Sequence, residues 1–143
     1  MQDSPFAALA GHKYINLTTF RRDGTPVTTP VWFAQDGDTL YVMTMASAGK
    51  VKRIRNNGQV EIAPASVSGA PLGPAVGGVA RVLPPGPEAQ RADRALNAKY
   101  GLIKRAFDLF GRMRGGNRVY LAITPRPMGV EATRQASIAA GAG

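Results

Sequence analysis

A short run of hydroxyl, glycine and basic residues inside the segment 40–60 has the composition of an anion-binding site. Thr44 ends a strand-like stretch, Ser47 and Gly49 follow it, and Lys50 comes next. A glycine lets the backbone approach a ligand closely, and the amides at a helix N-terminus together with a lysine form a cradle for an anion. The pattern predicts a phosphate site, but a solvated basic helix face has the same composition.

The charge of the chain is strongly positive and is concentrated in two segments. The formal net charge is +9, and Lys50, Lys52, Arg53 and Arg55 supply four of these charges within six residues. The segment 88–118 holds eight basic and three acidic residues, so it supplies the other five. Such a field attracts anions: phosphates, nucleic acid, acidic lipid or a polyanionic cofactor.

The chain lacks the residues for several kinds of self-contained catalysis. It has no cysteine, which excludes disulfides, thiolate metal sites and cysteine nucleophiles. His12 is the sole histidine, so a histidine metal cluster is excluded and a Ser-His-Asp triad has a single candidate base. We expect no metal site and no identifiable catalytic acid or base, and we expect His12 to be an ordinary surface residue. Any catalysis is therefore expected to use a borrowed cofactor.

Three consecutive strands are predicted in the first third of the chain. Runs rich in β-branched and aromatic residues are separated by the turn sequences Asp23-Gly24 and Asp36-Gly37-Asp38. The predicted strands are 13–21, 26–34 and 39–45. Two tight turns in succession indicate an antiparallel meander.

Three helices are predicted beside these strands. They are a short N-terminal helix within 1–10 that opens at Ser4-Pro5, a helix over 46–57, and a long helix from about Glu88. Ser47 is the expected cap of the second helix. Gly101 is expected to kink or break the third. The apolar positions that follow helical spacing in the third helix are Ala92, Leu96, Ile103, Phe107 and Phe110.

Three further strands bring the predicted number to six. They are 59–66, 75–83 and 118–124. The length of 143 residues suits a single domain, 1–143, with a weakly patterned tail at 126–143. Six short strands favour closure into a small barrel, because closure removes the exposed edges of a sheet.

No membrane span or export signal is expected. The first five residues, Met1 to Pro5, lack the basic residues that begin a signal peptide. The stretch 62–80 carries no charge, but Pro64, Pro71 and Pro74 interrupt it, so it is typical of strand-loop-strand structure. We therefore expect a soluble cytoplasmic protein that does not bind membranes.

The segment around Thr44 resembles the third strand and following helix of the pyridoxamine phosphate oxidase-like split-barrel family of flavin and deazaflavin proteins. The family pattern has a strand ending in Thr, a Lys six residues later and Asn-x-x-Val after the helix. Here Thr44, Lys50, Asn57 and Val60 stand in register, and the hairpin 17–33 is similar to the family's opening strands. A closer resemblance, to a subgroup of deazaflavin (coenzyme F420)-dependent enzymes, lies in Thr-Pro-Val-Trp at 29–32, Gly-Lys-Val-Lys-Arg-Ile-Arg at 49–55 and Lys-Tyr-Gly-Leu at 99–102.

The resemblance, which runs from Leu9 to Thr124, implies a mainly β fold with a few helices. That fold is a six-stranded antiparallel split β-barrel of the flavin-reductase/FMN-binding type, which forms a homodimer. The backbone residues implied to line the cofactor ring are Thr29, Pro30, Val31 and Trp32. Those implied to lie at the phosphate are Lys50 and its neighbours Thr44, Ser47, Gly49, Lys52 and Arg53. A lone strand tryptophan such as Trp32 is equally compatible with a place in the core.

The expected cofactor is F420, with FMN as the alternative. Relatives that bind FMN carry an Arg and a Lys on the second strand that grip its phosphate, and the stretch 28–33 has neither. The expected function is hydride transfer between the reduced deazaflavin and a small organic acceptor. The alternatives are an FMN-dependent oxidoreductase and a non-catalytic carrier of a flavin, deazaflavin or haem-type ligand. A nucleic-acid-binding barrel is disfavoured, because the strands lack interleaved exposed aromatics and lysines.

Overall fold

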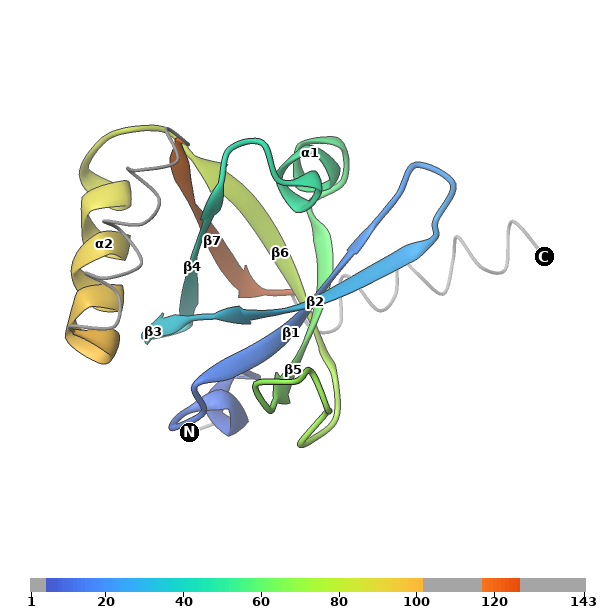
Figure 1. Cartoon of the computed structure of the whole chain (residues 1–143), viewed down its shortest axis with the longest axis horizontal. Helices are drawn as coiled ribbons and strands as arrows, with labels where there is room; N and C mark the ends of the chain where they lie inside the picture. Colours follow the sequence, from blue (N-terminus) through green and yellow to red (C-terminus); the bar gives the residue numbers. More distant parts are fainter. Residues whose placement is uncertain (1–4, 102–116, 127–143) are drawn as a thin grey trace.

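The computed structural model describes residues 5–101 and 117–126. Within them the chain forms a 3₁₀ turn, seven strands and two α-helices (Figure 1). In chain order these are η1 (Ala7–Leu9), β1 (Tyr14–Phe20), β2 (Pro26–Trp32), β3 (Ala34–Asp36), β4 (Thr39–Met45), α1 (Gly49–Asn56), β5 (Gln59–Ala65), β6 (Val76–Leu83), α2 (Pro87–Tyr100) and β7 (Arg118–Pro125).

The strands form one antiparallel sheet that curls on itself. Their order is β2-β1-β5-β6-β7-β4-β3, so β2 and β3 lie at opposite edges of the sheet. Only Phe33 separates these two strands in the chain, and a flat sheet cannot bring its two edges within one residue of each other. The sheet therefore curls until its edges meet, and β2 and β3 cross the curl as one continuous line (Figure 1). The result is a split β-barrel in which β2 and β4 touch without pairing.

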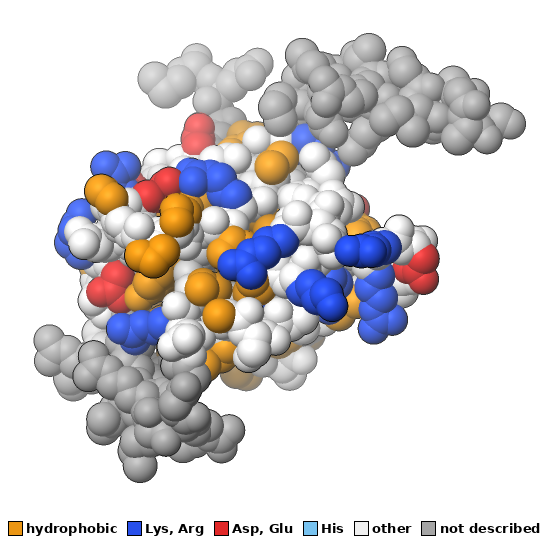
Figure 2. Space-filling model, turned by 90° about the horizontal axis from the view of Figure 1, so that it is seen from above, with side chains coloured by type: hydrophobic (Ala, Val, Ile, Leu, Met, Phe, Trp, Pro, Cys, Tyr) orange, Lys and Arg blue, Asp and Glu red, His pale blue; other side chains and the backbone are white. Residues whose placement is uncertain are grey.

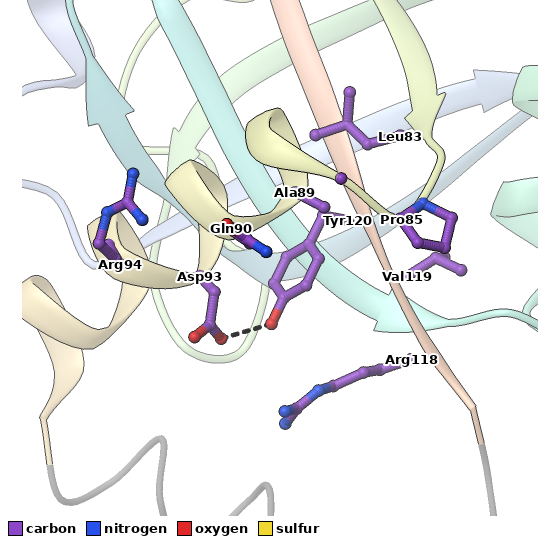
Figure 3. A pocket seen from close by; sticks show the side chains of 10 residues that line it. Leu83, Pro85, Ala89, Gln90, Asp93, Arg94, Arg118, Val119 and Tyr120 are labelled. Atoms are coloured by element: carbon purple, nitrogen blue, oxygen red, sulfur yellow. Dashed lines mark hydrogen bonds between the residues drawn. The ribbon is translucent and has the colours of Figure 1, made fainter.

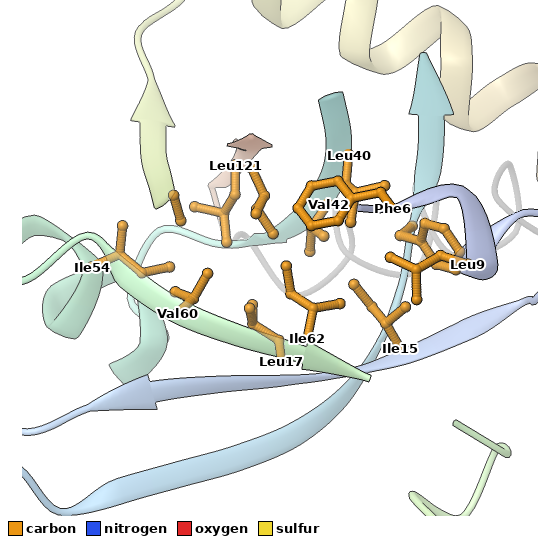
Figure 4. Packing of buried hydrophobic residues seen from close by; sticks show 13 residues of the cluster. Phe6, Leu9, Ile15, Leu17, Leu40, Val42, Ile54, Val60, Ile62 and Leu121 are labelled. Carbon is orange, nitrogen blue, oxygen red and sulfur yellow. The ribbon is translucent and has the colours of Figure 1, made fainter. Parts of the chain in front are cut away.

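The interior of the barrel is an apolar core. Along β1 every second residue is buried, which is the alternation of a strand with one face inside. Figure 4 shows apolar side chains converging from opposite walls of the barrel. Ile15, Leu17, Val42, Ile62 and Leu121 are each at most 1% exposed. Phe6 and Leu9, from the N-terminal turn, also belong to this cluster.

A second apolar cluster lies outside the barrel, under α2. Ala92 and Leu96 of the helix pack with Tyr41 of β4 and with Tyr120 and Ala122 of β7. The helix therefore covers the sheet near β3, β4 and β7, as Figure 1 shows. This placement brings the C-terminal end of α2 close to the junction of β2 and β3.

The predicted six strands are seven in the structure, because the second predicted strand, 26–34, is broken at Phe33. The N–H of Phe33 donates to the hydroxyl of Tyr100 at 3.0 Å, and the same hydroxyl lies 2.6 Å from the carbonyl oxygen of Phe33. The N–H and C=O of Phe33 are thus bonded to a side chain and not to a neighbouring strand. The chain changes sheet edges at this residue.

The predicted helix ends need two corrections. The N-terminal helix is only the 3₁₀ turn Ala7–Leu9. Ser47 is exposed and does not cap the next helix, which begins at Gly49 after Ala48 and has no side-chain cap. The reason is a turn before the helix, in which the N–H of Ala48 donates to the carbonyl of Met45 at 3.0 Å.

The predicted kink or break at Gly101 is a break of the described helix. The helix spans Pro87–Tyr100, and Gly101 follows it with a φ of 55°, which favours glycine. Ile103, Phe107, Phe110 and the tail beyond Arg126 lie outside the described residues.

Candidate functional site

A cavity of about 270 Å³ lies at the split between β2 and β4. Eleven described residues line it: Tyr14, Pro30, Val31, Trp32, Met43, Thr44, Met45, Lys50, Val67, Leu96 and Tyr100. Five predicted site residues, Pro30, Val31, Trp32, Thr44 and Lys50, are thus brought together although they come from three elements. Of the other predicted residues, Thr29, Ser47, Gly49, Lys52 and Arg53 do not line it.

The edge of β2 turns part of its backbone away from β1. In the hairpin, the N–H of Arg21 donates to the carbonyl of Thr25 at 2.9 Å, and hydrogen-bonded and non-hydrogen-bonded pairs alternate from there. In this register Pro26 and Pro30, which have no N–H, fall at non-hydrogen-bonded positions. The same alternation points the carbonyl of Pro30 and the backbone groups of Trp32 away from β1. This edge of β2 can present polar groups to a planar ring.

Lys50 stands at the polar end of the cavity, in the first turn of α1. Its side chain is half-buried, and burial, followed by the nearby charge of Arg53, lowers its pKa. The described part of the chain gives Lys50 no ion pair. No side chain caps α1. The N–H of Val51 donates to the carbonyl of Ala48 at 3.1 Å, and within the described residues the N–H groups of Gly49 and Lys50 remain for a ligand. A lysine and a helix N-terminus in one place favour a bound phosphate.

Arg53 has a structural partner. Its Nε donates to Oγ1 of Thr19 at 2.6 Å, and Thr19 is only 1% exposed. A Cβ at Gly49 would stand 2.7 Å from Nη1 of Arg53. A side chain at position 49 would therefore require the guanidinium group of Arg53 to shift, and the close approach to a ligand predicted for Gly49 stays a prediction.

Tyr100 and Trp32 form the aromatic wall of the cavity. The sequence pointed to Tyr100 only as part of the motif at 99–102, without a role at the site. Their ring centroids lie 5.1 Å apart with an interplanar angle of 15°. Burial raises the pKa of Tyr100 to about 12, so its hydroxyl remains protonated at neutral pH. Met43, Met45, Leu96 and Val67 were also missed. Their spacing is that of ordinary core or loop residues, so the sequence carries no signal for them.

Basic side chains gather on the face of the molecule that carries α1 and the β1–β2 turn. Figure 2, which looks down on α1 and the β1–β2 turn, shows Lys and Arg side chains spread around patches of hydrophobic ones. Arg21 and Arg22 of the turn and Lys52 and Arg55 of α1 are exposed. Lys50 begins the same helix as Lys52 and Arg55, so an anionic ligand at Lys50 would meet a positive field.

A larger groove, of about 550 Å³, lies between the first turns of α2 and the start of β7 (Figure 3). Its polar centre is the hydroxyl of Tyr120, which donates to Oδ1 of Asp93 at 2.5 Å. Arg94 and Arg118 stand at its sides. None of the predicted site residues lines this groove.

The described residues include neither a membrane-spanning helix nor a cluster of metal ligands. None of the described helices is both long and apolar enough to cross a membrane. Residues 5–101 and 117–126 contain no cluster of three histidine or acidic side chains that would hold a metal ion.

Comparison with known proteins gives a family match over most of the chain. Residues 2–129 match the family described as pyridoxamine 5'-phosphate oxidase. No curated protein sequence matches the chain.

Solved structures with the same fold carry several different functions. An F420 reductase is 22% identical, with a TM-score of 0.58, and the match covers 89% of this chain and 97% of the other. A FAD-binding protein from Mesorhizobium loti is 19% identical, with a TM-score of 0.59 and coverage of 84% and 83%. The haem storage protein HutZ from Vibrio cholerae is 15% identical, with a TM-score of 0.64 and coverage of 82% and 84%.

Proposed function

The chain belongs to the pyridoxamine 5'-phosphate oxidase family, and from this premise we propose that it is a deazaflavin (F420)-dependent oxidoreductase. The family binds flavins or deazaflavins. The observation that carries the proposal is the cavity between β2 and β4, where Lys50 and the uncapped start of α1 lie beside an aromatic wall and the outer edge of β2.

The residues present fit such a ligand. Lys50 is the one charged side chain among the described lining residues, and no acidic side chain lines the cavity. The rest of the lining is mainly apolar or aromatic, as in sites for planar ligands. A ring on the aromatic wall and a phosphate at Lys50 would each meet matching chemistry.

F420 is proposed over FMN because of the charge distribution. β2 carries no Arg or Lys, so a basic pair for the FMN phosphate is missing there. F420 continues beyond its phosphate into a tail with several carboxylates. The exposed Lys52 and Arg55 lie on the same helix as Lys50 and continue the positive surface outward, so they suit a long polyanion better than a single phosphate.

In this proposal the protein binds and orients, and the bound deazaflavin supplies the hydride chemistry. Lys50 and the α1 amides hold the phosphate, and the outer edge of β2 aligns the ring. Met43, Met45 and Leu96 keep water from the apolar part of the cavity. The hydroxyl of Tyr100 is engaged with backbone groups, so it is not assigned a proton-transfer role. The acceptor is a small organic molecule.

We expect F420 to bind more tightly than FMN, and its affinity to fall more steeply with salt. Attraction of a polyanionic tail is screened over a Debye length of about 8 Å at physiological ionic strength. Trp32 is the sole tryptophan of the chain and lines the cavity, so quenching of its emission reports binding directly. Titrations with F420 and FMN in a series of salt concentrations provide the measurement. Tighter FMN binding at every salt concentration would contradict the cofactor choice.

A non-catalytic carrier of a flavin or deazaflavin is the second candidate function. It is favoured by the lining of the cavity, in which Tyr14, Lys50 and Tyr100 are the only titratable described residues. His12 does not line the cavity either, which disfavours a histidine-ligated haem there. Multiple turnovers of reduced F420 with an electron acceptor would exclude the carrier function, and tight binding without turnover would support it.

We further propose that the protein is a homodimer whose second subunit completes this site. The cavity is slightly smaller than common ligand sites of about 300–1,000 Å³, and Val67 on its rim is 69% exposed. Leu72, in the same β5–β6 loop, is 57% exposed. A partner subunit would cover these side chains. Light scattering should give twice the chain mass of 15.1 kDa, and a single-chain mass at micromolar concentration would contradict the dimer.

A further inference from the structure

We infer that Tyr100 is a positioning residue that holds Trp32 and the end of β2 in place at the cavity. The inference rests on the proposed function, because the expected consequence of positioning this wall is alignment of the cofactor ring. It assigns a role to the C-terminal end of α2, an element outside the barrel.

Tyr100 acts on the cavity wall through both parts of its side chain. The ring stacks on Trp32 with a centroid distance of 5.1 Å. The hydroxyl accepts the N–H of Phe33 at 3.0 Å and lies 2.6 Å from the carbonyl of Phe33 and 2.7 Å from that of Lys13. Because a hydroxyl has one hydrogen, it donates to one of these carbonyls at a time. The side chain thus contacts Trp32 directly and also fixes the backbone of the next residue.

Phe33 is the residue at which the hydrogen bonds of Tyr100 have most effect on the position of β2. It is the single residue between the two edge strands β2 and β3, so no regular ladder holds it on both sides. Lys99 adds a second attachment at the same place. Its Nζ lies 3.6 Å from the centroid of the Phe33 ring and donates to the carbonyl of His12 at 2.5 Å. The last turn of α2 therefore anchors the junction where β2 leaves the cavity.

The hydroxyl is directed at the backbone, so its removal separates positioning from direct contact with a ligand. Tyr100→Phe keeps the ring in the cavity wall and removes only the bonds to Phe33 and Lys13. We expect a red shift of Trp32 emission in the protein without cofactor, because the end of β2 loosens and the indole gains water. We expect F420 affinity to fall about tenfold, since a wall misplaced by a fraction of an ångström aligns the ring less well.

Tyr120→Phe is the matched control. Like Tyr100, Tyr120 has a bonded hydroxyl, which donates to Asp93; its ring is buried, and it does not line the cavity. The Tyr120→Phe variant should have a lower melting temperature but unchanged Trp32 emission and F420 affinity. If Tyr100→Phe behaves in the same way, with a lower melting temperature but unchanged emission and affinity, Tyr100 is structural only and the inference is wrong.

The two proposals fail in different ways. If the unaltered protein binds neither F420 nor FMN, the proposed function is overturned. In that case Trp32 emission still decides whether Tyr100 positions the wall. If the unaltered protein binds F420 and Tyr100→Phe binds it equally well, the proposed function stands and the positioning role does not.

Discussion

Replacing Lys50 by alanine should weaken binding of the cofactor by about tenfold to a hundredfold, because a charge-assisted contact to a phosphate contributes about 1.5–3 kcal/mol. Lys50 is the one charged side chain among the described lining residues of the cavity. Its pKa is lowered by burial and by Arg53, so its ammonium group needs a compensating negative charge. A phosphate would provide that compensation, and alanine would remove it.

Lys52→Ala is the control for this prediction. Lys52 lies two residues further along α1, carries the same charge, and is exposed and absent from the cavity lining. It should weaken binding only through the long-range field, with an effect that disappears at high salt. Both variants are compared by titration on Trp32 emission, with circular dichroism to confirm folding. Equal effects of the two substitutions at all salt concentrations would show that the phosphate does not bind at Lys50.

The local part of the fold follows well from the sequence. The turns at Gly24 and Gly37 have φ angles of 90° and 61°, which is the backbone geometry that Asp-Gly turn sequences predict. Each turn closes a hairpin, β1–β2 at Gly24 and β3–β4 at Gly37. The predicted three-stranded meander is wrong, because its middle strand divides into β2 and β3, which lie at opposite edges of the sheet. The break at Phe33 could not be predicted in this way. It accompanies the curl of the sheet and the bonds of Phe33 to the hydroxyl of Tyr100, 67 residues away, and no local propensity reports such long-range partners.

In the candidate site too, residues close together in the sequence could be predicted, and contacts between distant segments could not. The spacing of Thr44 and Lys50 places both at the cavity, because a strand end and the next helix start are neighbours in the chain. The prediction that Ser47 caps α1 was wrong, because the turn that precedes the helix was not visible in the pattern. The aromatic partner of Trp32 comes from α2, and its proximity depends on packing of the helix against the sheet.

Arg53→Ala should lower the free energy of unfolding by about 1–3 kcal/mol, because it leaves a buried hydroxyl without its partner. The Nε of Arg53 donates to Thr19 at 2.6 Å, and Thr19 is 1% exposed. This bond joins α1 to β1, and Val51 and Ile54 of the same helix are buried. For a chain of this size, each kcal/mol corresponds to about 2–4 °C in melting temperature.

A double-mutant cycle with Thr19→Val separates this bond from the other effects of removing an arginine. Valine keeps the shape of threonine and removes the hydroxyl, so the pair loses its bond with little change in packing. If the bond holds α1 in place, Arg53→Ala should cost much less in the Thr19→Val background than in the unaltered protein. Strictly additive losses in thermal or urea unfolding would mean that the two side chains do not interact. In the coupled case, Arg53 secures the helix whose first turn carries Lys50, a role separate from the phosphate contact that we propose for Lys50.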